Sequence, residues 1–149
     1  TVVDQTTEEV TKYRRRLAEQ EELEPLGKKL GPLAISTLRG QYADNREWSA
    51  DPSLPAVIVG TVDMIGSRLL FSGYGVGKAR PLHAGFLGQD VLLVHDEAHL
   101  EPAFQDLLVA IETEQSRCNE FARLRVMELS ATSRGSEDVL TLTEKDYVE

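Results

Sequence analysis

Four short apolar runs, separated by segments with helical spacing, constrain the fold of this 149-residue chain most strongly. The runs are LAISTL at 33–38, AVIVG at 56–60, VLLV at 91–94 and LRVMEL at 124–129. VLLV has no helical periodicity, which is typical of a buried strand in a parallel sheet, and we interpret the other three as strands too. Strands that alternate with helices predict βαβ units, so we expect an α/β fold with a mostly parallel sheet flanked by helices.

The segments between the runs predict helices and loops. Apolar residues three or four apart predict amphipathic helices at 4–22 and 102–116, and another helix is expected at 61–71. Residues 41–55 are polar and contain several turn formers, so we predict a loop in which Trp48 packs against the protein rather than stacking on a base. Residues 139–142 could form a further strand.

Composition limits the classes of function. A net charge of −9 argues against a simple electrostatic nucleic-acid binder, although binding through backbone amides and a few side chains stays open. The single cysteine, Cys118, excludes an internal disulfide and a multi-cysteine zinc site. No apolar run approaches membrane-spanning length and no signal-peptide pattern is present, so we expect a cytoplasmic protein that does not bind membranes. Because the chain begins at Thr1 without a methionine, we expect a piece of a longer protein.

The stretch VLLVHDEAHL offers two candidate sites. His95 and His99 have the spacing of a zinc-binding helix, but the protease pattern H-E-x-x-H requires glutamate where this chain has Asp96. If a strand ends near His95, the two histidines do not face one ion, and His95 is a packed strand residue. Asp96 and Glu97 then project from the carboxyl edge of the sheet, where open α/β sheets bind ligands. The pattern therefore favours a nucleotide site, with a solvated turn as the alternative.

The segment SGYGVGKA resembles a phosphate loop but departs from the pattern G-x-x-x-x-G-K-[ST] twice. Ser72 stands where the first glycine belongs, and Ala79 replaces the hydroxyl residue that holds magnesium. We therefore predict that residues 72–88 are a flexible, glycine-rich surface connector.

The order of the motifs resembles that of superfamily 2 helicases. D-E-A-H after one apolar strand and S-A-T after the next are similar to motifs II and III of the first RecA-like domain, and TVVDQ is similar to the end of motif Ia. VGTVDMIGSRLLFSGYG, ISTLRGQ and LTLTEKD resemble the CRISPR-associated helicase-nuclease of type I systems. The resemblance implies that residues 1–149 are a partial first RecA-like domain, from the end of motif Ia through motif III and the following strand. The first strand and the Walker A loop are absent from these residues.

This resemblance implies a site for ATP and Mg²⁺. Asp96 would hold the magnesium ion, and Glu97 would orient or deprotonate the attacking water. His99 would link the nucleotide to Ser130 and Thr132, which transmit its state to the nucleic-acid groove. For Ser130 and Thr132, a cap on a short following turn is the alternative.

The resemblance also implies nucleic-acid contacts and a coupling residue. Arg39, Gly40 and Thr61 fall where family members touch the phosphodiester backbone, contacts that position a strand without reading its sequence. Arg39 and Thr61 could instead be structural. Gln5 stands at the usual glutamine of motif Ia and would take part in coupling.

The resulting hypothesis is an ATP-dependent DNA helicase or translocase domain of a CRISPR interference enzyme that unwinds target DNA for degradation. The implied partners are single-stranded DNA, a CRISPR effector complex, a second RecA-like domain and a nuclease domain. Residues 1–149 supply neither the Walker A lysine nor the motif VI arginines, so we expect this piece to be inactive alone. Two alternatives remain: another superfamily 2 helicase or restriction-enzyme motor, and a non-catalytic interaction domain with a helicase-like fold.

Overall fold

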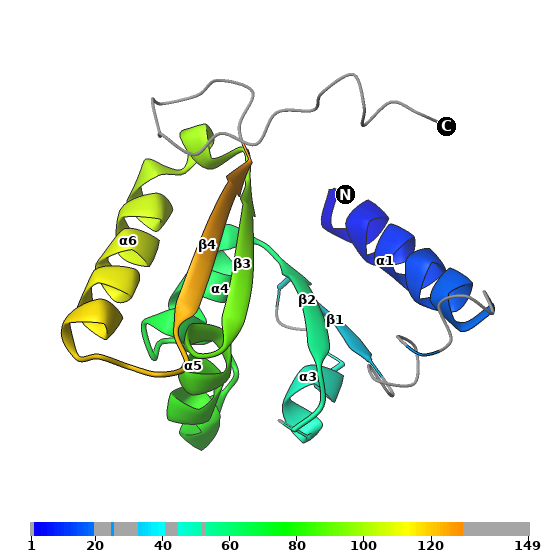
Figure 1. The fold of residues 1–149 in the computed structure, drawn as a ribbon, viewed down its shortest axis with the longest axis horizontal. Helices are drawn as coiled ribbons and strands as arrows, with labels where there is room; N and C mark the ends of the chain where they lie inside the picture. Colours follow the sequence, from blue (N-terminus) through cyan, green and yellow to red (C-terminus); the bar gives the residue numbers. More distant parts are fainter. Residues whose placement is uncertain (1, 20–24, 26–32, 41–44, 52, 130–149) are drawn as a thin grey trace.

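The computed structural model describes residues 2–19, 25, 33–40, 45–51 and 53–129, which form alternating helices and strands (Figure 1). In chain order the main elements are α1 (Val2–Glu19), β1 (Ala34–Leu38), α3 (Glu47–Ala50), β2 (Ala56–Gly60), α4 (Val62–Leu69), α5 (Arg80–Gly88), β3 (Val91–Asp96), α6 (Pro102–Arg117) and β4 (Leu124–Leu129). Short 3₁₀ turns lie at Gly77–Ala79 (η2) and Ala98–Leu100 (η3). The predicted α/β class is confirmed, and each of the four predicted strands forms.

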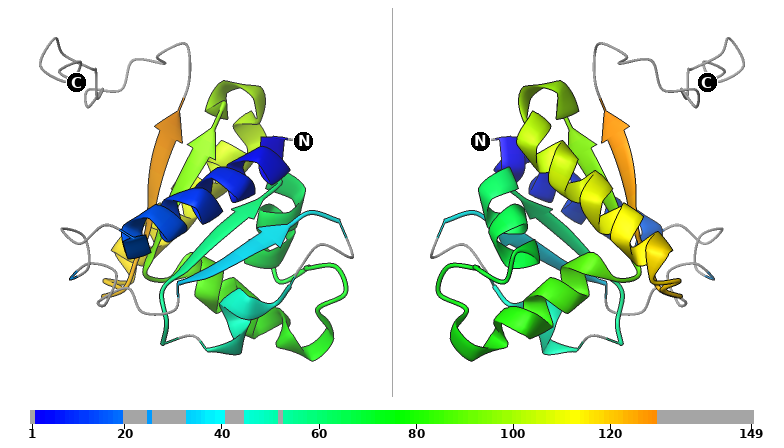
Figure 2. Two further views of the ribbon diagram at one scale, coloured as in Figure 1. Left: turned by 90° about the vertical axis from the view of Figure 1, so that its right-hand side faces the viewer. Right: turned by 90° about the vertical axis from the view of Figure 1, so that its left-hand side faces the viewer.

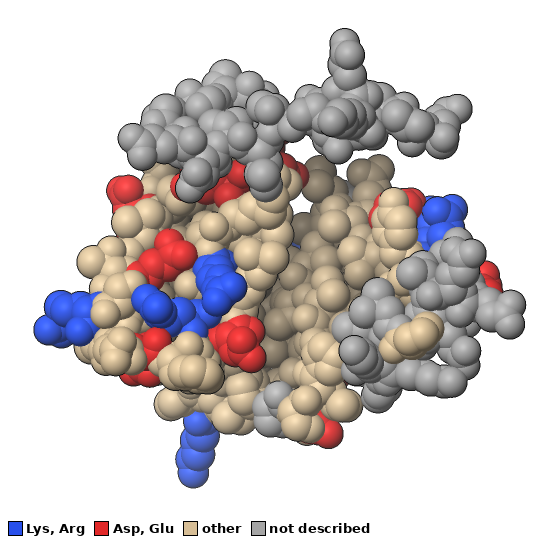
Figure 3. Space-filling view, in the orientation of Figure 1, with Lys and Arg blue, Asp and Glu red and all other residues tan. Residues whose placement is uncertain are grey.

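The described strands pair in parallel, as predicted, but in two separate two-stranded sheets. β1 pairs with β2 in the register Ala34↔Ala56, and β3 pairs with β4 in the register Val91↔Leu124. The expected single sheet does not form among the described residues, because β2 and β3 are not hydrogen-bonded to each other. The space-filling view shows the surface recessed between the two sheets (Figure 3).

One hydrophobic core joins both sheets to the helices on one side. Its buried members are Leu38, Trp48, Met64, Leu69, Leu87, Phe104, Leu108 and Leu124. They come from β1, α3, α4, α5, α6 and β4, so the inner faces of the two sheets share a single apolar interior. Both sheets therefore pack against one core despite the break between β2 and β3.

Helix α1 covers the other face of the β1–β2 sheet (Figures 1 and 2). The Thr7 and Thr37 hydroxyl oxygens lie 3.0 Å apart, whereas Leu38, the next residue of β1, belongs to the core on the opposite face. The Arg14 guanidinium donates to the Leu33 carbonyl, 3.0 Å away, near the start of β1. Asp4 pairs with Arg39 beyond the end of β1, so α1 runs antiparallel to β1.

The outer face of the β3–β4 sheet is exposed among the described residues. Leu92 and Val94 retain 64% and 51% of their accessible surface, while Leu93 packs against the core. The apolar run VLLV therefore forms the predicted strand, but the expectation of a buried strand is wrong for the face that carries Leu92 and Val94. Among the described helices, α1 lies against β1 and β2.

The prediction of a connector at 72–88 is wrong for the second half of this segment, because residues 80–88 form helix α5. Pro81 stands in the first turn of that helix, where its fixed φ is favourable, and His83, Ala84 and Leu87 are buried at helical spacing. The many glycines concealed this apolar face in the sequence.

The predicted polar loop contains the short helix α3, which buries Trp48. The Trp48 ring packs edge-on against His83, with ring centroids 4.7 Å apart, and against Phe86. Packing was predicted for Trp48 and is confirmed. The possible strand at 139–142 lies outside the described residues. In the part of the chain that the structure describes, none of the helices has the length and apolar character needed to cross a bilayer.

Candidate site at the carboxyl end of strand β3

The chain makes a sharp turn where β3 ends. Glu97 follows Asp96 with φ 51° and ψ 41°, a left-handed conformation that is uncommon for a residue with a side chain. The Asp96 carboxylate accepts a hydrogen bond from the Glu97 backbone N–H at 3.0 Å, which stabilises the turn. Both side chains are exposed, so the two residues, called the carboxylate turn below, present their carboxylates to solvent.

The arrangement of the two histidines excludes a zinc-binding helix at this position. His95 lies in strand β3 and is 4% exposed, whereas His99 lies in the turn η3. His95 is a packed strand residue, as predicted. His99 instead approaches the carboxylate turn, with its Nδ1 atom 3.4 Å from the Glu97 Oε2 atom. This contact can hold the Glu97 carboxylate in one orientation.

The donor set of the carboxylate turn fits magnesium. The described residues contain no group of three or more histidine, cysteine or acidic side chains that could bind a metal ion together. Mg²⁺ does not need such a group, because it is usually held by one or two carboxylates, several waters and the phosphates of a nucleotide. One Asp96 oxygen accepts the backbone hydrogen bond, and the exposed carboxylate of Asp96 leaves its second oxygen for a ligand.

The residues predicted to contact nucleic acid come together at the carboxyl ends of β1 and β2. Arg39 and Gly40 directly follow β1, Thr61 directly follows β2, and the Thr61 N–H donates to the Leu38 carbonyl at 3.2 Å. Gly40 has φ 64°, a conformation that favours glycine, and an added Cβ atom there would meet no neighbour within 4 Å. The accessible backbone of Gly40 and the guanidinium of Arg39 therefore belong to adjacent residues at this edge.

The remaining predicted residues are not brought to the carboxylate turn. Arg39 forms an ion pair with Asp4, and Gln5 is exposed on α1 beside Asp4. None of the contacts described for the chain joins Gln5 to the carboxylate turn. Ser130 and Thr132 lie outside the described residues, and the described chain ends at Leu129, the register partner of Asp96.

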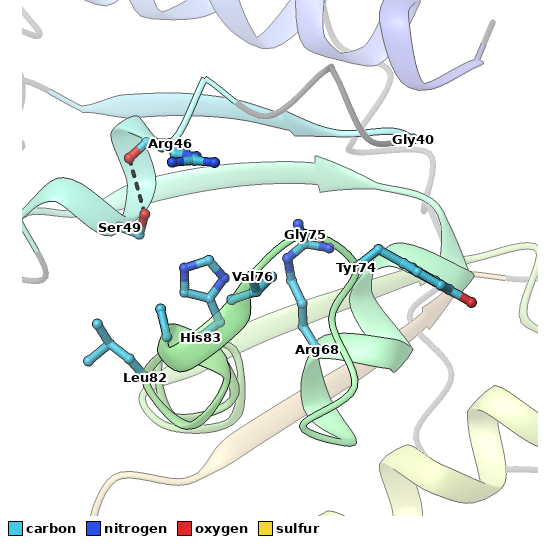
Figure 4. A pocket seen from close by; sticks show the side chains of 10 residues that line it. Gly40, Arg46, Ser49, Arg68, Tyr74, Gly75, Val76, Leu82 and His83 are labelled. Carbon is cyan, nitrogen blue, oxygen red and sulfur yellow. Dashed lines mark hydrogen bonds between the residues drawn. The ribbon is translucent and has the colours of Figure 1, made fainter.

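Sequence reasoning missed a pocket of about 300 Å³ beside Gly40 (Figure 4). The side chains of Arg46, Arg68 and His83 extend towards it from three separate segments. Arg68 is 3% exposed, and its guanidinium donates to the Met64 carbonyl at 3.0 Å. Since these residues are far apart in sequence and in no motif, no sequence signal could have grouped them.

Comparisons with known proteins do not add a family to this geometry. No protein-family model matches the chain, and neither a curated protein nor a solved structure matches it. The function must therefore be inferred from the residues and their arrangement.

Proposed function

We propose that this chain is part of the first RecA-like domain of a superfamily 2 helicase and contributes to ATP hydrolysis that drives movement along DNA. One observation supports this most: an exposed Asp-Glu pair occupies a tight turn at the carboxyl end of a parallel strand. This edge is where open α/β sheets bind nucleotides. The neighbouring strand β4 ends in register with Asp96, and S-A-T follows it in the sequence.

Each residue of the carboxylate turn has a distinct proposed role. Asp96 would hold Mg²⁺, which when bound neutralises charge on the phosphates. Glu97 would orient and deprotonate the attacking water, a role that requires an ionised carboxylate within hydrogen-bond reach of that water. The Nδ1 atom of His99 lies 3.4 Å from the Glu97 carboxylate, so His99 would keep this carboxylate oriented towards the nucleotide and away from strand β3.

The nucleic-acid strand would cross the carboxyl ends of β1 and β2. There, the Gly40 backbone and the Thr61 and Arg39 side chains would contact phosphates rather than bases. The net charge of −9 makes non-specific attraction weak, so a few placed contacts would carry the affinity. The wording of the flanking segments favours a CRISPR-associated helicase-nuclease, with a CRISPR effector complex as the recruiting partner.

The decisive experiment measures ATP hydrolysis by the full-length protein, with and without single-stranded DNA, beside the Glu97→Gln variant. DNA-stimulated hydrolysis that depends on Glu97 would support the motor. A folded protein that hydrolyses no ATP in either condition would contradict it and favour a non-catalytic binding module.

Arg39→Ala is expected to weaken binding of single-stranded DNA by about two- to fivefold, because an exposed charged contact contributes less than about 1 kcal/mol. The loss should be similar for all DNA sequences. The slope of log Kd against the logarithm of the salt concentration should become smaller by roughly 1, the value expected for one lost phosphate contact. Fluorescence anisotropy with labelled oligonucleotides at several salt concentrations measures both quantities.

Two further variants control this result. Arg117 is likewise exposed and ion-paired, with Glu114, at the far end of α6, so Arg117→Ala should leave DNA affinity unchanged. Asp4→Asn removes the carboxylate that competes with phosphate for Arg39 and should strengthen binding by up to about fivefold. Equal losses for Arg39→Ala and Arg117→Ala would mean that only net charge matters.

A further inference from the structure

A chain of hydrogen bonds beneath the carboxylate turn links three elements of the fold. His95 of β3 shares a hydrogen bond of 2.9 Å between its Nδ1 atom and the Oε1 atom of Gln105 in α6. The Gln105 amide nitrogen in turn donates to the Glu128 carboxylate of β4. His95 and Glu128 are register partners in the parallel β3–β4 pair. The two hydrogen bonds therefore connect β3 through α6 to β4, and the pairing of β3 with β4 joins the two ends.

The direction of the hydrogen bonds identifies the His95 nitrogen atom that donates. Because the Gln105 amide nitrogen donates to Glu128, its carbonyl oxygen faces His95 and can only accept. The His95 Nδ1 atom must then carry a proton and donate it in the hydrogen bond to Gln105. Both hydrogen bonds are therefore donated in the direction of the exposed carboxylate of Glu128.

Packing alone does not explain a histidine at this position. His95 is 4% exposed, and its ring meets that of Phe104 edge-on, with centroids 5.0 Å apart. Its Nε2 atom is buried without a hydrogen-bond partner among the described residues, which carries a desolvation cost that leucine would avoid. What histidine adds over an apolar residue is the Nδ1–H bond to Gln105.

The location of the bond suggests its purpose. His95 immediately precedes Asp96, and Glu128 immediately precedes Leu129, the register partner of Asp96. A bond at His95 therefore fixes the last residues of β3 relative to both α6 and β4. The strained left-handed Glu97 lies two residues further on, where a small shift of the strand end would redirect its carboxylate.

We propose that His95 is a positioning residue for the carboxylate turn, acting through the His95–Gln105–Glu128 chain. This inference deepens the proposed function and rests on it for its effect on ATP hydrolysis. Gln105 connects His95 to Glu128, and Glu128 holds the other end of these hydrogen bonds on β4. None of the three residues contacts the nucleotide in this scheme.

Two different substitutions of His95 in the full-length protein separate a positioning role from a packing role. His95→Leu keeps the apolar volume and removes the donor, so kcat for ATP should fall about tenfold while Tm and the KM for ATP stay near wild type. His95→Asn keeps an N–H donor near the position of Nδ1 but removes part of the ring, so Tm should fall while kcat stays within about threefold. An unchanged kcat for His95→Leu, or losses of kcat that follow Tm in both variants, would overturn the proposal.

Gln105 and Glu128 provide a second test away from the core. Gln105→Met has similar length but neither accepts from His95 nor donates to Glu128, so it should reproduce the loss of kcat seen for His95→Leu. Glu128→Gln keeps the acceptor oxygen and should leave kcat within about twofold of wild type. If Gln105→Met retains full kcat, the relay is wrong.

A readout without ATP keeps this inference distinct from the proposed function. The Glu97 amide is held by the Asp96 carboxylate, so its hydrogen exchange reports opening of the carboxylate turn. His95→Leu should speed exchange at residues 96–100 about tenfold and leave exchange in α1 unchanged. Faster exchange without any ATP hydrolysis by the wild type would refute the motor and retain the positioning role. Unchanged exchange would refute the positioning role.

Discussion

Replacing Glu97 with glutamine is expected to lower the kcat of DNA-stimulated ATP hydrolysis by about 10²- to 10⁴-fold, the usual contribution of a general base. Glutamine has the same length as glutamate but cannot accept a proton from the attacking water. The side chain is exposed, and the hydrogen bond that holds the turn uses the Glu97 backbone N–H rather than its carboxylate. Folding and the KM for ATP should therefore stay close to wild type.

Glu101 provides the matched control for this substitution. It is also an exposed glutamate, lies four residues further on, and directly precedes α6. Glu101→Gln removes the same charge from the same surface and should change kcat by less than about twofold, because an exposed charge at this distance is largely screened. Steady-state phosphate release measures both variants. Equal activities for Glu97→Gln and Glu101→Gln would mean that the carboxylate turn is not the hydrolytic site.

The strands could be predicted from the sequence because each is a short apolar run with a clear boundary. AVIVG and LRVMEL form β2 and β4 at the predicted residues. Helix α5 could not be predicted in the same way, because its buried residues are interrupted by glycines that are typical of loops. The exposure of Leu92 and Val94 could not be predicted either, because it depends on which elements cover β3.

For the candidate site, local sequence predicts the position but not the connections. The Asp-Glu pair after VLLV indicates a strand end, and the structure places it there. The left-handed Glu97 and the His95–Gln105 bond are set by how β3 enters the turn and how α6 packs back across it. The pairing of Arg39 with Asp4, 35 residues apart, likewise depends on α1 lying along β1.

A large loss of stability is expected on truncation of Leu108, which is fully buried in α6. Its side chain belongs to the core that contains residues of β1 and β4, so truncation leaves a cavity inside that core. Leu108→Ala should lower the free energy of unfolding by about 2–5 kcal/mol. Urea denaturation of this chain, followed by the fluorescence of Trp48, its single tryptophan, measures the change, because Trp48 is buried in the same core.

The neighbouring Val109 separates burial from helix propensity. It is 49% exposed on the same helix, so Val109→Ala removes apolar atoms without opening a cavity and should change the free energy of unfolding by less than about 0.5 kcal/mol. A large difference between the two variants would show that α6 is held by the common core. Equal effects would contradict that arrangement. They would imply that α6 is only loosely packed on β3 and β4, and the His95–Gln105 bond would then have no rigid helix against which to position the carboxylate turn.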